Sequence, residues 1–131
     1  MTYLLDTNVC IKYLNGRSKN IRRNLEASLP QGIVLCAVVK AELFYGAMKS
    51  ARPKENLSKL HHFVNRFVSL PFDDNAAETY GQIRAHIEKA GTPIGPNDLL
   101  SAASARANNL TLVTHNTGEF GRVKGLQFED W

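Results

Sequence analysis

Three of the twelve acidic side chains in this chain follow stretches that are typical of buried β-strands: Asp6, Glu42 and Glu119. The stretches are Tyr3 to Leu5, Ile33 to Val38 and Leu110 to Thr114. Because the strands of an open parallel sheet end at one edge, we expect these three carboxylates to meet there. Asp98 joins them if the helix that follows Gly95 and Pro96 begins at the same edge.

A cluster of carboxylates restricts the chemistry that it can support. Carboxylates within a few ångströms of one another repel, and some take up protons unless a cation neutralises them. Ligand sets made only of oxygen favour Mg²⁺ or Mn²⁺ over zinc. A bound hard cation acidifies water and offsets negative charge on a phosphate. The pattern therefore indicates hydrolysis of a phosphodiester.

Each of the four acids also has a simpler explanation. Asp6 could be the N-cap of a helix, and Glu42 could be a solvated helix residue. Asp98 could stand where it does because a carboxylate suits the positive end of a helix. Glu119 could be a solvated turn residue. The joint pattern is stronger than any one of the four positions.

Composition indicates a single soluble domain that spans residues 1–131. The hydrophobic fraction is 44% and the charged fraction 21%, as in ordinary globular proteins. No apolar run is long enough for a membrane span, and MTYLLDTN lacks the features of a signal peptide, so we expect a cytoplasmic protein. The net charge of +4 hints at a polyanionic partner. We expect Cys10 and Cys36 to be reduced core residues.

Apolar spacing predicts strands that alternate with helices. Further strands are expected at Val68 to Phe72 and Gly125 to Phe128, the latter after a polar turn. Helices are expected at Val9 to Leu14, Ile21 to Leu29 with a break at 30–32, Ala41 to Met48, a stretch marked by Leu57, Leu60, Val64 and Phe67, Ala76 to Ala90, and Leu99 to Ala107. This order predicts an α/β sandwich around a mostly parallel sheet.

Four short strings carry a resemblance to a known family: LLDTN at 4–8, AELFYG at 41–46, GPNDLL at 95–100 and LVTHNTGEF at 112–120. In this order and spacing they resemble PIN-domain nucleases and, more closely, the VapC toxins of bacterial type II toxin–antitoxin systems. The resemblance runs to the closing EDW at 129–131 and so covers nearly the whole chain. It implies a PIN-like three-layer α/β/α sandwich with a central sheet of four to five strands.

The resemblance also implies an activity and a site. The family's acidic, metal-binding and catalytic positions correspond to Asp6, Glu42 and Asp98, with Glu119 as a more variable fourth. Polar positions that line the family's pocket correspond to Asn8, Thr114 and Asn116. The implied protein is a homodimeric endoribonuclease that uses one or two Mg²⁺ or Mn²⁺ ions and is neutralised by a VapB-like antitoxin. The closing region is most similar to the subgroup that cuts initiator tRNA in its anticodon loop.

Two groups of basic residues are candidates for RNA binding. One contains Arg17, Lys19, Arg22 and Arg23, and the other contains Lys49, Arg52 and Lys54. Loops with such charge beside an acidic crevice suit phosphate contacts, although charge runs are often only solvated faces. His115 could also contact a phosphate, and an ordinary surface histidine is the alternative.

Two other functions are compatible with parts of the pattern. An aspartyl-phosphate hydrolase also places an Asp after a first buried strand. Such enzymes typically have a second Asp two residues later, where this chain has Asn8. A PIN-like scaffold that binds RNA or protein without cutting is the non-enzymatic alternative. The presence of all four acids argues against that scaffold.

Overall fold

A computed structural model describes residues 2–28 and 32–131 and contains five strands and seven helices within those ranges. The strands are β1 (Tyr3–Leu5), β2 (Ile33–Cys36), β3 (Val68–Leu70), β4 (Thr111–Val113) and β5 (Gln127–Glu129). The helices are α1 (Thr7–Leu14), α2 (Lys19–Ser28), α3 (Ala37–Met48), α4 (Pro53–Val64), α5 (Asp74–Lys89), α6 (Pro96–Ala107) and α7 (Thr117–Phe120).

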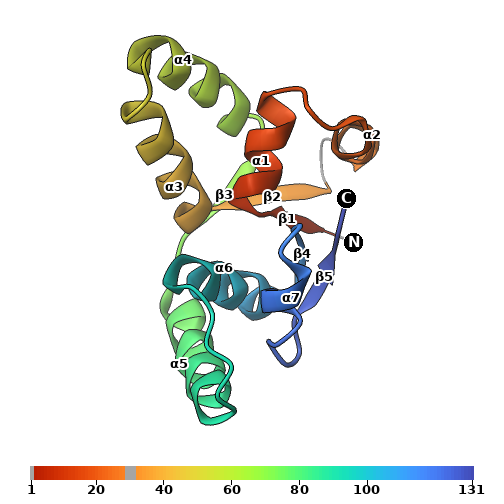
Figure 1. Ribbon diagram of the computed structural model, residues 1–131, viewed down its shortest axis with the longest axis vertical. Coiled ribbons are helices and arrows are strands. Elements are labelled where there is room, and N and C mark those ends of the chain that lie inside the picture. Colours follow the sequence, from red (N-terminus) through yellow and green to blue (C-terminus); the bar gives the residue numbers. More distant parts are fainter. Residues whose placement is uncertain (1, 29–31) are drawn as a thin grey trace.

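The strands form one parallel sheet in the order β3-β2-β1-β4-β5. Figure 1 shows α1 to α4 on one side of this sheet and α5 and α6 on the other. The predicted α/β sandwich is therefore confirmed, and the sheet has the upper number of expected strands. Because β1 lies at the centre of the sheet, the residue that follows it is surrounded by other strand ends.

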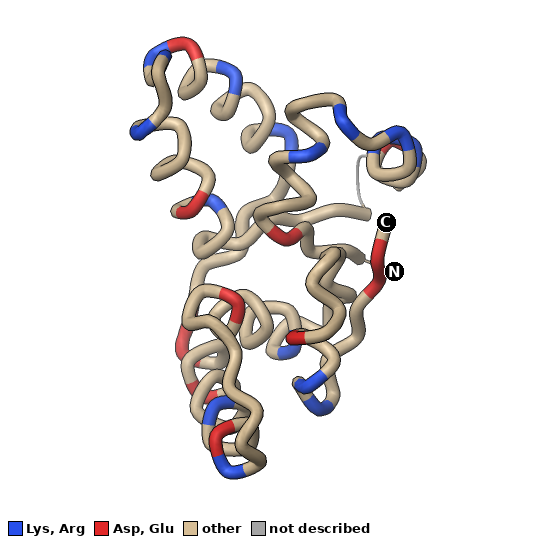
Figure 2. The backbone as a smooth tube through the Cα atoms, viewed as in Figure 1, with Lys and Arg blue, Asp and Glu red and all other residues tan. Residues whose placement is uncertain are grey.

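Charged residues lie on the helices, the connecting loops and β5, whereas β1 to β4 carry none (Figure 2). Strands that are covered by helices on both faces are expected to be mainly apolar. This holds for β1, β2 and β4, in which Thr111 is the one polar residue, whereas Val68 and Ser69 of the edge strand β3 are exposed. In the described part of the chain, no helix has the length and apolar character that crossing a bilayer requires.

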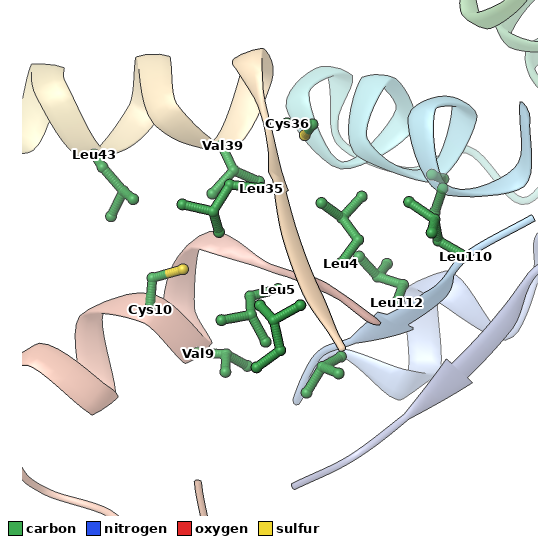
Figure 3. Packing of buried hydrophobic residues seen from close by; sticks show 14 of the residues in the cluster. Leu4, Leu5, Val9, Cys10, Leu35, Cys36, Val39, Leu43, Leu110 and Leu112 are labelled. Carbon is green, nitrogen blue, oxygen red and sulfur yellow. The ribbon is translucent and has the colours of Figure 1, made fainter. Parts of the chain in front are cut away.

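The core is centred on the two middle strands. Leu4 of β1 pairs in register with Leu112 of β4, and both are completely buried. Figure 3 shows these residues in one cluster with Cys10 and Cys36. Both cysteines are buried free thiols, as the sequence predicted, and burial raises the pKa of each. High thiol pKa values keep both side chains protonated and unreactive.

Helix α6 approaches the sheet closely because its buried face is made of small residues. Ala102, Ala103 and Ala105 are fully buried, and so is Ser104 between them. The helix packs on β4 and runs beside α5 (Figure 1). Its first turn carries Asp98, so the packing of α6 on β4 fixes where that carboxylate lies.

The second strand is shorter than the sequence predicted, which moves Glu42. We expected a strand from Ile33 to Val38 and a helix from Ala41, but the strand ends at Cys36 and α3 begins at Ala37. A β-branched apolar run does not distinguish a buried strand from a buried helix start, and Val39 is buried as part of α3. Glu42 consequently lies in the second turn of α3 and not in the first.

Other boundaries differ by a few residues, mainly because helix caps and proline extend the helices. Helices α1, α2, α4, α5 and α6 all begin before their first expected residue, and α4 and α6 start at Pro53 and Pro96. Strands β3 and β4 are shorter than expected, and β5 is shifted toward the C-terminus. The polar turn after β4 contains the short helix α7. The predicted end of the second helix at Leu29 and most of the break at 30–32 lie outside the described residues.

Candidate active site

All four acidic side chains lie at the edge of the sheet where the strands end. Asp6 follows β1, Glu42 projects from α3, Asp98 lies in the first turn of α6, and Glu119 lies in α7. Their charges interact: Glu42 raises the pKa of Asp6, and the other three acids all raise the pKa of Asp98. The expectation that Asp98 would join the other three is therefore met in this structure.

Asp6 is the most enclosed of the four. It is only 4% exposed, and its Oδ2 accepts a 2.9 Å hydrogen bond from the hydroxyl of Thr114, which is itself completely buried. Burial raises the pKa of Asp6, although the bond from Thr114 and the backbone N–H of Thr7 partly oppose that shift. Asp6 occupies the N-cap position of α1 without a side-chain capping bond, so capping does not account for this carboxylate.

Glu42 is held between two neutral donors from other helices. Its Oε1 accepts a 2.7 Å hydrogen bond from the hydroxyl of Thr7, and its Oε2 accepts one of 3.3 Å from Nδ2 of Asn97. These bonds connect α3 to the starts of α1 and α6. They orient the carboxylate without neutralising it, because neither donor carries a charge.

Asn116 connects the remaining two acids. Its Nδ2 lies 3.3 Å from Oδ2 of Asp98 and 2.6 Å from Oε2 of Glu119, and both oxygens accept from it. Its backbone N–H donates to the Thr114 hydroxyl at 3.0 Å. One hydrogen-bonded chain thus runs from Asp6 through Thr114 and Asn116 to the other two carboxylates.

The pKa values of Asp98 and Glu119 are shifted in opposite directions because their carboxyl groups are in contact. Burial, the contact with Glu119 and the charges of the other acids together raise the pKa of Asp98 to about 7. The same contact is the main reason why the pKa of Glu119 is lowered, and Asn116, Gly95 and Arg122 add to that shift. The contact therefore favours the protonated form of Asp98 beside the ionised form of Glu119.

The donor set fits a hard divalent cation such as Mg²⁺ or Mn²⁺. Its charged donors are four carboxylates, whose oxygens these ions prefer, with amide and hydroxyl groups beside them. Burial is the main cause that raises the pKa values of Asp6 and Asp98, and the charges of neighbouring acids add to both shifts. A cation placed among these oxygens would favour the ionised form of each acid.

The carboxylates are not arranged as a complete set of metal ligands in this structure. Within residues 2–28 and 32–131, no three or more His, Cys, Asp or Glu side chains are gathered closely enough to hold a metal ion. Their oxygens bond instead to Thr7, Asn97, Thr114 and Asn116, and Asp98 bonds to Glu119. Binding of an ion would therefore require some of these side chains to rotate, beginning with the Asp98–Glu119 pair.

The polar positions taken from the resemblance divide into two groups. Thr114 and Asn116 belong to the hydrogen-bonded chain described above. Asn8 is exposed in the first turn of α1 and takes part in no hydrogen bond with another described side chain. His115 is half-buried and pairs through Nδ1 with Asp130 near the end of the chain.

Sequence reasoning missed three residues that interact with the acids, two through hydrogen bonds and one through its charge. Thr7 and Asn97 both donate to Glu42, and each stands directly beside an acid that the sequence had singled out. Arg122 lowers the pKa of Glu119, and its Nη1 donates to the carbonyl of Pro93 at 3.1 Å. Adjacency to Asp6 and Asp98 was the only available signal for the first two residues, because their partner lies far away in the chain.

The two predicted basic groups lie away from the acids. Arg17, Lys19, Arg22 and Arg23 are exposed on α2 and the loop before it, and Lys49, Arg52 and Lys54 are exposed where α3 meets α4. Figure 2 shows positive charge at both of these outer regions and negative charge near the centre. Two of the seven cations are engaged by helix neighbours, since Arg22 pairs with Glu26 and Arg52 pairs with Glu55.

Comparison with known proteins shows to which family this arrangement belongs. Residues 3–126 match the PIN domain family. The chain is 42% identical to the tRNA(fMet)-specific endonuclease VapC of Shigella flexneri, covering 100% of this chain and 98% of that protein. It is 40% identical to ribonuclease VapC2 of Rickettsia felis, with the same coverage.

Solved structures with the same fold agree with the sequence comparison. VapBC2 from Rickettsia felis, bound to a DNA fragment from its promoter, contains a chain that is 39% identical and superposes with a TM-score of 0.93, covering 100% of this chain and 99% of that one. DNA-bound VapBC from Salmonella typhimurium contains one that is 37% identical, with a TM-score of 0.94 and coverage of 100% and 98%. The chain belongs to the PIN-domain family and, within it, to the VapC group.

Replacing Asp98 by Asn should stabilise the metal-free protein above neutral pH. The pKa of Asp98 is about 7 in the folded protein and near its ordinary value of 3.8 in the unfolded chain. The stability that this proton contributes is therefore complete below pH 3.8 and is lost as pH rises through 7. In EDTA at pH 8, Asp98→Asn should melt roughly 2 to 5 °C above the unchanged protein.

The matched control for this measurement is Glu78→Gln, since Glu78 is an exposed acid on α5. It should leave the melting temperature and its pH dependence nearly unchanged. An Asp98→Asn protein that melts no higher than the parent at pH 8 would show that Asp98 carries no uncompensated charge.

Proposed function

We propose that this protein is a metal-dependent endoribonuclease and acts as the toxin of a toxin–antitoxin pair. The observation that carries the proposal is the convergence of Asp6, Glu42, Asp98 and Glu119 at one sheet edge, where none of them forms an ion pair with a basic side chain within the described residues. The names of the similar VapC proteins, which are ribonucleases and endonucleases, support the same reaction.

Each carboxylate has a distinct part in this proposal. Asp6, Glu42 and Asp98 hold one Mg²⁺ or Mn²⁺ ion, and Glu119 holds a second ion or a water molecule of the first. When bound, the cation supplies acidified water and offsets the charge that develops on the phosphate. One of the four carboxylates accepts the proton of the attacking water. Thr114 and Asn116 orient these acids, and Asn8 lies at the outer rim of the site.

The proposed substrate is tRNA, and the anticodon loop of initiator tRNA is the specific candidate. Relatives from Shigella flexneri and Salmonella typhimurium, 42% and 37% identical, are both named tRNA(fMet)-specific endonucleases. The basic groups on α2 and at the α3–α4 junction are proposed to contact the RNA backbone outside the site. Their separation from the acids suits a folded RNA better than a short fragment.

Removing single carboxylates should abolish cleavage. Asp6→Asn, Glu42→Gln and Asp98→Asn each keep the shape of the side chain but lose one charge, so cleavage of total tRNA with Mg²⁺ should fall by roughly 10²- to 10³-fold. Glu119→Gln should cost less, because Glu119 supports a second ion or a water. Gel analysis of end-labelled tRNA measures the rates.

Glu78→Gln again serves as the control and should cleave at the parent rate. EDTA should stop cleavage, and added Mg²⁺ or Mn²⁺ should restore it. Discrete fragments that form equally well in EDTA would exclude metal dependence. RNA that is bound but never cut would instead identify a catalytically silent binding module, and a phosphoenzyme trapped at Asp6 would identify a phosphohydrolase.

The Thr114 hydroxyl should be needed for full activity because it is the side-chain donor to Asp6. Thr114→Val is nearly isosteric but leaves Asp6 without this bond and Asn116 N–H without its acceptor. Losing such an orienting group typically costs about 10- to 100-fold in metal affinity or activity. Thr114→Ser keeps the hydroxyl and should recover most of the rate. Equal rates for the valine variant and the parent would contradict this role.

The proposed partners are a VapB-like antitoxin and a second copy of the chain. Similar structures contain VapBC complexes, and the fold match extends over the whole chain. Expression alone should therefore arrest bacterial growth, co-expression with the antitoxin encoded beside it should relieve the arrest, and sedimentation should show a dimer. Normal growth with abundant folded protein would contradict the toxin role, and a monomer at micromolar concentration would contradict the dimer.

A further inference from the structure

A hollow of about 420 Å³ lies between α5, the end of α6 and the loop that joins α7 to β5. Its floor is apolar, because it is formed by the buried side chains of Ile83 and Ile87. Its rim is basic or neutral: Gln82, His86, Arg106 and Lys124. No Asp or Glu lines it. We name this feature the basic hollow, and neither predicted basic group contributes to it.

Two side chains of the basic hollow, Arg106 and Lys124, are positively charged at neutral pH and form no ion pair in the described part of the chain. Arg22, Arg52 and Arg84 each form an ion pair with a glutamate on their own helix, whereas Arg106 and Lys124 form none within residues 2–28 and 32–131. Unpaired cations that share one concave site raise the local concentration of anions.

The local backbone holds Arg106 against the loop. Gly125 has a φ of +82°, a region that favours glycine, and a Cβ there would lie 3.5 Å from Nε of Arg106. The guanidinium therefore lies next to the Gly125 backbone, and a Cβ at this position would be in ordinary van der Waals contact with it. Arg106 is half-buried, so less side-chain entropy is lost when it binds a phosphate.

The same loop reaches the acidic site. Lys124 comes five residues after Glu119 in the sequence, and Arg122 between them lowers the pKa of Glu119. Arg122 also bonds to the carbonyl of Pro93 in the loop that leads to α6. Arg122 thus lies near Glu119, and Lys124 at the rim of the basic hollow follows two residues later. Arg106, the other cation of the hollow, lies in the last turn of α6, at the opposite end of that helix from Asp98.

We propose that the basic hollow is a second binding site for the RNA substrate, where Arg106 and Lys124 contact backbone phosphates while the scissile phosphate lies at the carboxylates. This inference rests on the proposed ribonuclease function. Charge complementarity selects a phosphate, and the apolar floor beside it accommodates the face of a sugar or base. A polymer that crosses the acidic edge needs such cations nearby to offset repulsion.

The test measures RNA binding separately from cleavage. Binding of labelled tRNA is measured in EDTA over a series of salt concentrations for the parent, Arg106→Gln, Lys124→Gln and the double variant. Each single variant should weaken binding by roughly 3- to 10-fold, and the dependence of log K on log salt should become shallower by about 0.7 to 1 per charge. With Mg²⁺, the same variants should show a higher KM.

Matched controls remove the same charges elsewhere: Arg84→Gln on the other side of α5 and Lys59→Gln on α4, both of which are ion-paired in the structure. They should bind RNA like the parent. If Arg106→Gln disturbs the loop that it packs on, Lys124→Gln still decides the question, because Lys124 is exposed and forms no ion pair within the described residues.

The outcomes separate this inference from the proposed function. Unchanged tRNA affinity and salt dependence in the double variant would overturn the inference even if cleavage is normal. Weaker binding of a mononucleotide or of inorganic phosphate, with tRNA binding unchanged, would also overturn it, because the hollow would then hold a small anion. Parent protein that binds tRNA through the hollow but never cuts it would support the inference while contradicting the nuclease proposal.

Discussion

Asp6 occupies a position that the pairing of the two central strands dictates. The N–H of Asp6 donates to the carbonyl of Val113 at 2.9 Å, which continues the β1–β4 pairing by one step beyond β1. Thr114 is the next residue along from Val113, so its hydroxyl reaches the Asp6 carboxylate. Desolvation at this point is nearly complete, and one hydroxyl and one backbone N–H only partly offset it. The pKa of Asp6 consequently stays raised, and the rest of the site is arranged around a buried acid that favours a cation.

The other side chains orient the acids and leave their charge in place. Thr7, Asn97, Thr114 and Asn116 are all neutral donors. Within the described ranges, none of the four acids forms an ion pair with a basic side chain. A lysine in their midst would stabilise the folded protein and at the same time occupy the space of a cation. The four acids therefore lower the free energy of unfolding, and the apolar core beneath them offsets this loss, as in many functional sites.

Whether the sequence predicts a contact in this site depends on how far apart its two residues are along the chain. Asp6 was found because an acid directly after a buried strand must lie at the strand end, and strand ends meet. Asp98 follows a loop, so its position depends on where α6 begins. The family resemblance, and not the strand pattern, identified it as a site residue. Thr7 and Asn97 were missed because their bonds to Glu42 join side chains that are 35 and 55 positions apart. The error in the predicted start of α3 has a different origin. The β-branched residues favour a strand locally, but the helix begins at Ala37 and buries Val39 in the core.

The charge distribution has to satisfy two opposite requirements. Hard cations need concentrated carboxylate oxygens, whereas a polyanionic substrate is repelled by them. The chain separates the two in space. Its acids lie at one edge of the sheet, whereas the basic groups on α2 and at the α3–α4 junction and the basic hollow lie away from them. The loop from α7 to β5 joins both regions, because the Arg122–Pro93 bond ties it to the loop before α6. Glu119 and Lys124 are five residues apart, so one short stretch of chain carries both a carboxylate of the site and a cation of the basic hollow.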